Sequence, residues 1–564
     1  MYPIPPSETL IETKTCKHCS TSFPITDKDI EFYDKVSPTF WGQKYQIPTP
    51  TLCPDCRQQR RLSFRNERKL YKRKCDATGK EIVSIYSPDK TYSVFDEHHW
   101  KSDAVDNLIY WFEFNSQENF FVQVSKLNDI VPKNSLYTGS GSENSEYNNF
   151  IWNMKDCYLV FDSMDSSSCY YGVKISYSTD CIDCLNVFES TKCYWLIDWY
   201  KCFEVFYSQN CKESKNLYYC NNCIDCSNCI NCTGLINKQF YINNAPVSTD
   251  EYASALKDIF LKESQKKKTS IHRHNHILAS TNSSWDYLEW CNNASYCYDW
   301  VNLNSARYCY NAHGATDVGD LNSWWDRSSL IYEWMAVWTK THGVVSGVCC
   351  WGGCTNIYYS FFMSGCSDCF GCIGLRNKSY CILNKQYTKE EYEELVPQII
   401  ERMMADREWG EFFPSSMSPF GYNETVAQEY FPLTREEITE SGIFNWSDYE
   451  APFPTVEKVI PASLLPEDIA QIPDDVLNWA IECEVTGRPF RIIRQELEFY
   501  RKHSLPIPRR HPDQRHLDRM ALRNPRKLYE RQCDKCWVDM ITTYAPERPE
   551  TVYCEECYNR EVLG

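Results

Sequence analysis

The sequence contains no run of about 18 consecutive apolar residues, the length that an α-helix needs to cross a bilayer. Its opening residues, Met1 to Glu8, carry neither a basic segment nor an apolar core, so we expect no signal peptide. Both absences predict a cytoplasmic protein that does not associate with a membrane. GxGxxG, P-loop and Ser-His-Asp signatures are also missing, which favours a protein that is not an enzyme but leaves an unrecognised active site open.

Cysteine, in contrast, is abundant, with 32 residues in a chain of 564. In a secreted chain this number would predict disulfides. In the cytoplasm we expect thiols or metal ligands instead. The net charge of −17 argues against nucleic-acid binding over the whole surface, although the charge is unevenly distributed.

The cysteines between Cys157 and Leu235 recur at every third position or a multiple of it, and every other position of that register is small or apolar. An α-helix repeats every 3.6 residues and a strand every two, so neither explains this pattern. It predicts a β-solenoid whose coil lengths are multiples of three. Thiols are small and readily buried, so we expect them inside. These cysteines are Cys157, Cys169, Cys181, Cys184, Cys193, Cys202, Cys211, Cys220, Cys223, Cys226, Cys229 and Cys232.

The pattern returns with an offset of 140, so that Cys297 matches Cys157. This predicts a second solenoid of the same length. In its middle, Arg327, Glu333 and His342 stand on the register. The core there is therefore either locally shifted or opened by a loop.

The segment Cys220–Cys232 also has the CxxC spacing of an iron–sulfur ligand run. Because its cysteines continue the register that begins at Cys157, we interpret them as a ladder of core thiols. A metal, a cluster or disulfides remain as alternatives.

Two CxxC pairs near the start of the chain predict a zinc ribbon. Two such turns can enclose Zn²⁺ in a tetrahedron of four thiolates, which leaves no open position for catalysis. The alternative, a redox CxxC, would need one pair beside a βαβ pattern. The predicted ligands are Cys16, Cys19, Cys53 and Cys56.

The end of the chain repeats its beginning. With an offset of 458, Arg65–Tyr71 matches Arg523–Tyr529. Each terminal module is therefore predicted to be two ribbon units in tandem, with one structural zinc site kept in each. Two further turns, at Cys75 and Cys483, look like CxxC knuckles that have lost some of their cysteines. Whether these degraded knuckles bind a metal stays undecided from the sequence. The intact set in the last module is Cys533, Cys536, Cys554 and Cys557.

A basic stretch lies between the two ribbon units of each module. A zinc-held segment of this kind could present guanidinium groups to phosphate, which predicts association with RNA or the ribosome. The alternative is a solvated helix face that pairs with acidic residues of the chain. No base-reading motif is present, so sequence-specific recognition is not supported. The candidate residues are Arg57, Arg60, Arg61, Arg65, Arg68, Lys69, Arg515, Arg519, Arg523, Arg526 and Lys527.

The predicted fold is mainly β with some α: two tandem cysteine-rich β-solenoids flanked by N- and C-terminal zinc-ribbon modules. The expected order is a ribbon module (1–100), an aromatic and helical connector (101–138), the first solenoid with its closing helix (139–265), the second with its closing helix (279–408), a connector rich in proline, aromatics and acids (409–475) and the last ribbon module (476–564).

Several motifs carry a family resemblance: the runs Cys53–Arg61 and Arg65–Tyr71, Pro512–His516 and Tyr544–Glu550. With the cysteine-rich middle they resemble uncharacterised zinc-ribbon, cysteine-rich proteins of small-genome candidate-phylum bacteria, over most of the chain. The resemblance implies zinc ribbons and a cytoplasmic bacterial setting, and no activity.

Three functions follow as hypotheses. The first is a zinc-stabilised protein that is not an enzyme and associates with RNA or the ribosome through its basic ribbon segments. The second is a protein-interaction scaffold that uses the Tyr- and Trp-rich solenoid surface. The third is an enzyme with its site in the irregular second solenoid, around Trp324 to Cys354.

Overall fold

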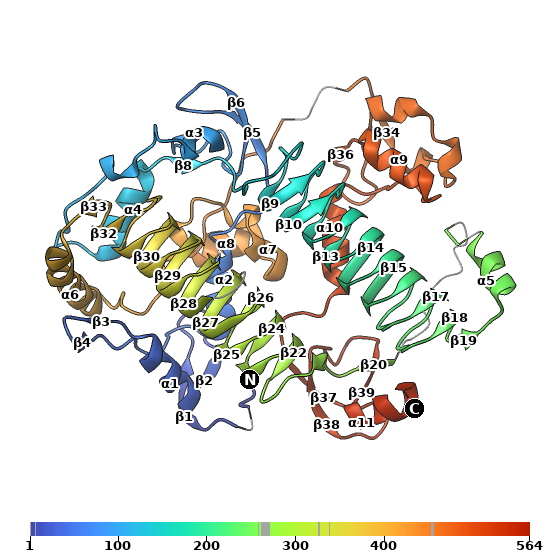
Figure 1. The fold of residues 1–564 in the computed structure, drawn as a ribbon, viewed down its shortest axis with the longest axis horizontal. Coiled ribbons are helices and arrows are strands. Elements are labelled where there is room, and N and C mark those ends of the chain that lie inside the picture. Colours follow the sequence, from blue (N-terminus) through green and yellow to red (C-terminus); the bar gives the residue numbers. More distant parts are fainter. Residues whose placement is uncertain are drawn as a thin grey trace. The chain divides into compact units, whose positions relative to one another are not determined.

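The computed structural model describes residues 2–5, 7–257, 259–260, 271–324, 328–337, 339–452 and 456–563. The chain forms two compact units (Figure 1). Unit 1 consists of Met1–Ser135, Asn275–Tyr449 and Arg526–Leu528, and unit 2 of Leu136–His274, Glu450–Pro525 and Tyr529–Gly564. Each unit therefore combines one solenoid with the terminal module that lies farther from it in the sequence.

The first solenoid, in unit 2, is built from coils in which stacked residues are 12 apart in the sequence. Strand β10 (Phe161–Ser167) pairs in parallel with β11 (Val173–Ser176), so that Phe161 lies opposite Val173. Every third residue has a positive φ, as at Asn186 (57°), so each coil turns four corners. Asn and Asp tolerate this conformation better than most residues do, and they are frequent at these corners. The predicted β-solenoid is confirmed.

Inside the coils, thiols and hydroxyls satisfy the same backbone groups. Cys169 Sγ donates to the carbonyl oxygen of Ser167 (3.3 Å), two residues earlier. Ser178 Oγ donates in the same way to Ser176 (2.8 Å) and accepts the backbone N–H of Ser190 from the next coil (3.1 Å). Cysteine and serine thus alternate on the register because both are small donors. The predicted thiol ladder faces inward, and its cysteines are free.

The strands of this solenoid share one sheet, and a short helix, α5 (Thr249–Leu256), follows them. The range predicted for the first solenoid and its closing helix extends to residue 265. The helix ends at Leu256, and residues 258 and 261–270 lie outside the described residues. The remaining strands are β9 (Asn149–Lys155), β12 (Thr179–Ile182), β13 (Leu185–Phe188), β14 (Thr191–Tyr200), β15 (Phe203–Lys212), β16 (Lys215–Tyr218), β17 (Ser227–Ile230), β18 (Gln239–Ile242) and β19 (Ala245–Pro246).

The second solenoid, in unit 1, has the same construction with two irregularities. In its first coil the stacked residues are 11 apart, as at Ile277 opposite Leu288. In three successive pairings the stacked residues are 13 apart, beginning with Ala315 opposite Ser328. Its strands are β21 (Ile277–Leu278), β22 (Trp285–Glu289), β23 (Asn292–Ser295), β24 (Cys297–Val301), β25 (Asn304–Arg307), β26 (Tyr310–His313), β27 (Ala315–Trp324), β28 (Ser328–Val337), β29 (His342–Trp351), β30 (Thr355–Ser364), β31 (Ser367–Phe370), β32 (Ser379–Ile382) and β33 (Lys385–Gln386).

The extra residue in each of these coils moves the register, and the core is locally shifted. Trp334 and Val344 now face the interior, while Glu333 and His342 leave it. Of the two alternatives for this region, a shifted core or a core opened by a loop, the first is therefore right for Glu333 and His342. Arg327 lies outside the described residues.

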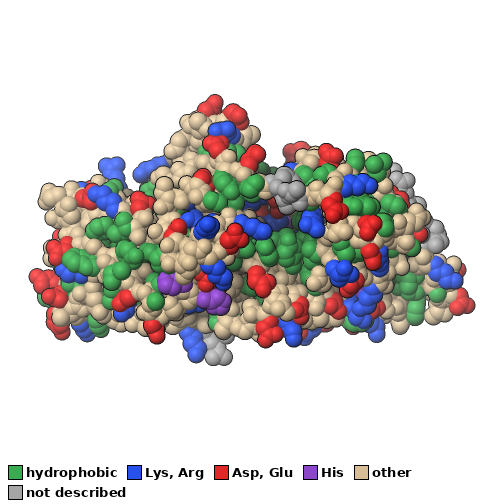
Figure 2. All heavy atoms as spheres, turned by 90° about the horizontal axis from the view of Figure 1, so that it is seen from above, with side chains coloured by type: hydrophobic (Ala, Val, Ile, Leu, Met, Phe, Trp, Pro, Cys, Tyr) green, Lys and Arg blue, Asp and Glu red, His purple; other side chains and the backbone are tan. Residues whose placement is uncertain are grey.

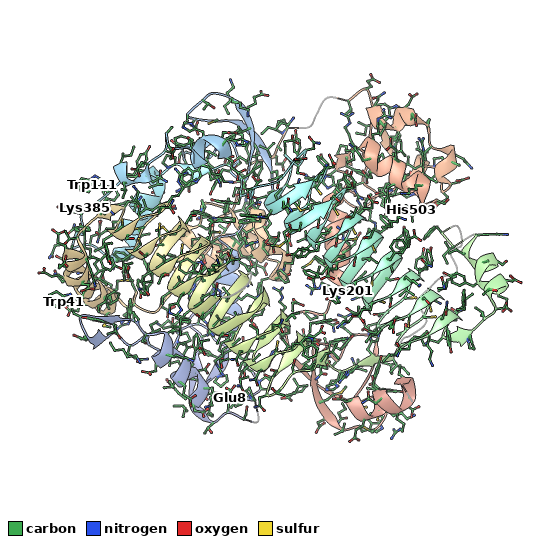
Figure 3. All side chains as sticks on the ribbon, viewed as in Figure 1. Glu8, Trp41, Trp111, Lys201, Lys385 and His503 are labelled. Atoms are coloured by element: carbon green, nitrogen blue, oxygen red, sulfur yellow. The ribbon has the colours of Figure 1, made fainter. Side chains whose placement is uncertain are left out.

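The N-terminal module and its connector pack in unit 1. In the first part of the connector, Trp111 lies beside Lys385 of the second solenoid (Figure 3), with Lys385 Nζ 5.1 Å from the ring centroid. The elements are β1 (Leu10–Thr15), β2 (Ser22–Thr26), α1 (Asp27–Val36), β3 (Thr39–Phe40), β4 (Gln43–Lys44), α2 (Pro54–Leu62), β5 (Tyr71–Lys74), β6 (Glu81–Ser84), β7 (Val94–Phe95), α3 (Glu97–Lys101), η1 (Asn107–Ile109), α4 (Phe120–Ile130) and β8 (Lys133–Asn134).

The C-terminal module packs in unit 2, where the His503 ring lies against the first solenoid (Figure 3), 5.4 Å from the Phe206 ring. Its elements, with the nearby β20 (Ile271–Arg273), are β34 (Lys458–Pro461), η4 (Ala462–Leu464), η5 (Ile469–Gln471), η6 (Asp474–Asn478), β35 (Trp479–Glu482), β36 (Pro489–Phe490), α9 (Arg494–Lys502), α10 (Pro512–Leu522), β37 (Tyr529–Gln532), β38 (Asp539–Thr542), β39 (Thr551–Tyr553), α11 (Glu555–Tyr558) and η7 (Asn559–Leu563).

The remaining helices belong to unit 1. Helix α6 (Lys389–Asp406) begins at a capping box in which Thr388 Oγ1 accepts the N–H of Glu391. After it come η2 (Ser415–Met417), η3 (Tyr422–Glu424), α7 (Val426–Tyr430) and α8 (Arg435–Ser441). Among the described residues, no helix has both the length and the apolar character that a membrane crossing requires.

Candidate metal centres and the arginine clusters beside them

The four cysteines of the N-terminal module converge on one point. Cys16 and Cys19 lie on the turn between β1 and β2, Cys53 is the N-cap of α2, and Cys56 lies in the first turn of that helix. Their sulfurs all lie within 4.8 Å of one another, and Cys19 Sγ is 3.6 Å from Cys53 Sγ. A hydrogen bond with Cys56, partly offset by burial, lowers the pKa of Cys53 to about 7.

The C-terminal module builds the same arrangement. Cys533 and Cys536 lie on the turn between β37 and β38, and Cys554 and Cys557 lie at the start of α11. The sulfurs again lie within 4.8 Å of one another, with 3.6 Å between Cys536 Sγ and Cys554 Sγ. Burial raises the pKa of Cys533, but backbone N–H groups, including that of Cys554 (3.2 Å), outweigh it and lower the pKa to about 6.

Both groups fit a tetrahedral metal ion. With metal–sulfur bonds of about 2.3 Å, the sulfurs of such an ion lie about 3.8 Å apart, close to the 3.6 Å found here. Four thiolates complete the coordination and leave no position for a substrate or water. The two groups could therefore hold a metal ion in a structural role. Four sulfur donors suit zinc or iron.

The degraded knuckles keep the turn and lose the ligands. Asp96 N donates to Cys75 Sγ (3.2 Å), as Cys554 N does to Cys533 Sγ (3.2 Å). The knuckle at Cys483 has the same turn, closed by Gly487 N to the Cys483 carbonyl oxygen (2.9 Å). Among the described residues, however, only the two four-cysteine groups bring three or more ligand atoms within 4.8 Å. Neither Cys75 nor Cys483 belongs to such a group.

The run Cys220–Cys232 does not form such a group either. Cys220 Sγ donates to the Tyr218 carbonyl oxygen (3.4 Å) and Cys232 Sγ to that of Ile230 (3.2 Å), as the other interior thiols do. These side chains are at most 2% exposed. The geometry agrees with core thiols and offers no cluster site.

The arginines of α2 are buried in ion pairs on the outer face of the second solenoid. Arg61 Nη1 lies 3.0 Å from Asp320 Oδ1 and 2.8 Å from Glu333 Oε2. Arg57 Nε lies 2.9 Å from the same Asp320 oxygen. Arg60 bridges Glu333 (3.0 Å) and Glu411 (3.0 Å). Arg57 and Arg61 are at most 1% exposed.

A second cluster in unit 2 follows the same plan, 458 positions later in the sequence. Arg519 Nη1 lies 2.7 Å from Asp183 Oδ1, and Arg515 Nη1 contacts the other oxygen of Asp183. Arg515 also lies 3.3 Å from Glu496 Oε1. Both arginines are at most 1% exposed, and the Arg515 guanidinium stacks on the Tyr171 ring at 4.5 Å.

The other candidate residues are engaged to different degrees. Arg65 is buried and pairs with Glu67, and Arg68 lies 3.7 Å from Glu429. Arg523 and Arg526 pair with Asp198 (2.9 Å) and Asp299 (3.0 Å), each through a nearly buried guanidinium. Lys69 is half-buried and Lys527 is exposed.

These contacts correct the expected exposed fork of guanidinium groups. Arg57, Arg61, Arg515 and Arg519 do not face solvent, because the acidic corners of a solenoid lie against their helix. The alternative was right that acidic residues of the chain are the partners, and wrong that this helix face is solvated. On the face drawn in Figure 2, lysine and arginine side chains are interspersed with acidic ones. RNA binding itself stays a prediction.

Sequence reasoning missed the acidic partners. Asp320 and Asp183 are single acids among many, and they lie 259 to 336 residues away from the arginines they bind. One signal was available: Glu333 interrupts an otherwise apolar and aromatic run, Ile331 to Val337. A charge in such a run needs a buried partner.

Comparisons with known proteins gave no match of any kind: no protein-family model, no curated protein and no solved structure is similar to this chain.

Proposed function

We propose that this protein is a zinc-binding scaffold without catalytic activity, in which one structural Zn²⁺ holds each terminal module in shape. The observation that carries the proposal is the pair of four-cysteine groups, each with its sulfurs within 4.8 Å of one another. When bound, zinc would neutralise the thiolates and cross-link the two halves of a ribbon, and its closed coordination would leave no room for chemistry on a substrate.

Each site would also support an arginine cluster. Cys53 and Cys56 stand at the N-terminus of α2, the helix that carries Arg57 and Arg61. Fixing the start of this helix fixes where the guanidinium groups lie relative to Asp320. In this proposal zinc acts on the fold of unit 1 through the ion pairs, and zinc loss should loosen the module from its solenoid.

Metal analysis of the purified protein tests the proposal. We expect two zinc ions per chain, and one each in Cys16→Ser and Cys557→Ser. Cys75→Ser and Cys483→Ser are matched controls, because these cysteines sit on the same turn without ligand partners, and they should keep both ions. Iron in place of zinc, or two ions in Cys16→Ser, would contradict the proposal.

We also propose that the two terminal modules arose by duplication. Asp76 and Asp534, 458 positions apart, have the same partners. Each accepts a backbone N–H 18 residues later at 2.7 Å and an arginine three residues earlier at 3.0 Å. The paired arginine clusters add further support. Residues that match at the offset of 458 therefore also make equivalent side-chain contacts.

RNA or ribosome association is the second candidate function, favoured by Lys72 and Lys74, which are exposed on β5 beside the Cys75 knuckle. The test uses these lysines, since replacing buried arginines would disturb the fold. Salt-dependent RNA binding should weaken in Lys72→Glu/Lys74→Glu, and unchanged affinity would remove this candidate. A protein partner recovered in a pull-down despite nuclease treatment would favour the scaffold role alone.

The enzyme hypothesis for the second solenoid has less support. Its interior around the proposed site is filled by Trp334, Val344 and Cys350, all of which are fully buried. Trp324 belongs to β27, although its side chain and residues 325–327 and 338 lie outside the described residues.

A further inference from the structure

A cavity of about 630 Å³ lies on the outer face of the first solenoid, near its last coils, within unit 2. Residues that stack from coil to coil line it in two ladders, with successive members 12 apart in the sequence. Ile271, Leu522, Glu561 and Val562, which lie outside the coils in the sequence, also line it. One ladder is Ile197, Gln209, Asn221 and Thr233, and the other is Trp195, Tyr207, Tyr219, Asn231 and Asn243.

The second ladder changes from aromatic rings to amides. Tyr207 and Tyr219 stack with ring centroids 5.0 Å apart, and Trp195 lies 6.3 Å from Tyr207. At Asn231 and Asn243 the rings stop and carboxamides take their place. Rings and carboxamides therefore line one concave surface, a combination that suits a ligand with apolar faces and polar edges.

The amides have unused hydrogen-bonding capacity. Asn221 Oδ1 is buried and has no partner among the described residues. Asn231 Nδ2 donates to Asn243 Oδ1, which leaves Asn231 Oδ1 as an acceptor and Asn243 Nδ2 as a donor. Asn231 is half-buried and Asn243 is exposed, so these two carboxamide groups are within reach of a ligand in the cavity.

The second solenoid shows what the same face looks like when protein covers it. With the offset of 140, Phe361, Gly371, Ile373 and Leu383 stand in place of Asn221, Asn231, Thr233 and Asn243. This set of apolar residues lies under protein in unit 1.

Two aromatic segments provide that cover. The Phe413 ring lies 4.5 Å from Phe361, and a Cβ at Gly371 would meet Phe120 of α4 at 2.5 Å. The solenoid therefore accepts apolar residues on this face where a segment covers it. The amides of the first solenoid occur where the face is an open cavity, so the fold alone does not require them.

The charges at the cavity are few and opposed. Among the described residues of its lining, Lys238 and Glu561 are the charged ones, one of each sign. A phosphate backbone would need an excess of basic side chains, so the lining does not favour a nucleic acid. Carboxamides can donate to and accept from hydroxyl groups at once, and aromatic rings pack against the C–H faces of a sugar.

We propose that this groove binds an uncharged oligosaccharide. The rings of Tyr207, Tyr219 and Trp195 provide the apolar side of the site. The side chains of Gln209, Asn221, Asn231 and Thr233 bind the hydroxyl groups. No cysteine of either four-cysteine group lines the groove, but Glu561 and Val562 follow the proposed zinc ligand Cys557 closely in the sequence, so binding is tested on the metal-loaded protein.

Isothermal titration calorimetry of the full-length, metal-loaded protein tests the proposal. The probes are maltohexaose, cellohexaose, mannohexaose and N-acetylchitohexaose, each up to millimolar concentration. We expect at least one to bind, and Asn221→Ala and Thr233→Val to weaken its affinity about three- to tenfold, the loss of one hydrogen bond.

Asn228→Ala is the matched control, because Asn228 is paired with Asn216 (2.8 Å) on the same coils and does not line the groove. Its affinity should equal that of the wild type. The proposal fails if none of the four sugars binds the wild type, if Asn228→Ala weakens binding as much as Asn221→Ala does, or if both groove variants keep full affinity. Thr233→Val changes one hydroxyl only, so it keeps the test valid should Asn221→Ala fold poorly.

Discussion

Replacing Arg61 by methionine should destabilise unit 1 far more than the loss of a surface charge would. Arg61 is fully buried and reaches Asp320 and Glu333, while its Nε donates to Asn322 Oδ1 (2.9 Å). Methionine keeps most of the aliphatic volume and removes the charge and the donors. The variant therefore isolates the contribution of the guanidinium group.

The magnitude follows from the balance of charges in the cluster. Three arginines, Arg57, Arg60 and Arg61, face three carboxylates, Asp320, Glu333 and Glu411. Removing one leaves an unpaired buried negative charge, which typically costs about 3–5 kcal/mol. Burial already raises the pKa of Glu333, so proton uptake there limits the loss, and we expect about 3 kcal/mol.

Differential scanning calorimetry measures the effect as a shift of the unit 1 transition, at about 2 °C per kcal/mol for a unit of this size. Arg61→Met should lower that midpoint by about 6 °C. Arg435→Met is the control, because the Arg435 side chain is 58% exposed and pairs with an exposed Asp448. It should change the stability by about 0.5 kcal/mol or less.

The double variant Arg61→Met/Glu333→Met decides whether the unpaired charge is the cause. It restores the charge balance, so it should be more stable than Arg61→Met alone. If Arg61→Met has the same unit 1 midpoint as the wild type and instead loses RNA affinity, the reasoning is refuted, and this arginine binds an external ligand. If the double variant is the less stable one, the loss comes from packing.

Two further predictions concern unit 1. Burial lowers the pKa of Lys133 to about 7, so between pH 7 and 10 the unfolded chain binds more protons than the folded one, and stability should rise with pH by up to about 1.4 kcal/mol per unit. Lys133→Met should be more stable at pH 7 and lack this rise in thermal denaturation; parallel curves for both proteins would contradict the assignment. In Gly347→Ala, the new Cβ would lie 2.4 Å from the Ser360 carbonyl oxygen and 2.5 Å from Trp334, so we expect a loss of about 1–3 kcal/mol. Thermal denaturation measures the loss, and a midpoint equal to that of the wild type would contradict this packing argument.

The solenoids could be predicted because their signal is local and repeated. Each interior residue faces the inside of its own solenoid, so one rule of small or apolar side chains applies at every third position. The rule fails where a coil has one extra residue. Sequence alone does not tell whether the side chain of Glu333 points into the coil or away from it. Strand pairing resolves this, because it places Ile331 opposite Val344 and so counts one more residue in that coil than in its regular neighbours.

The four-cysteine groups could be predicted equally well, because a CxxC turn places two sulfurs on one side whatever surrounds it. The arginines were not, because their surroundings decide whether a guanidinium is a ligand for phosphate or a buried partner. Nothing near Arg61 in the sequence points to Asp320. The groove on the first solenoid escaped prediction for a similar reason: Asn221 and Asn231 belong to one cavity only once the coils are stacked.

The grouping of each terminal module with the more distant solenoid has a consequence for biosynthesis. Arg61 leaves the ribosome 259 residues before Asp320, a delay of about 13–50 s at common elongation rates of about 5–20 residues per second. During that time the nascent basic helix has no acidic surface to dock on. The first solenoid waits longer still, until Arg515 emerges 332 residues after Asp183. The early basic helix is therefore open to a chaperone or to ribosomal RNA throughout the translation of the first solenoid.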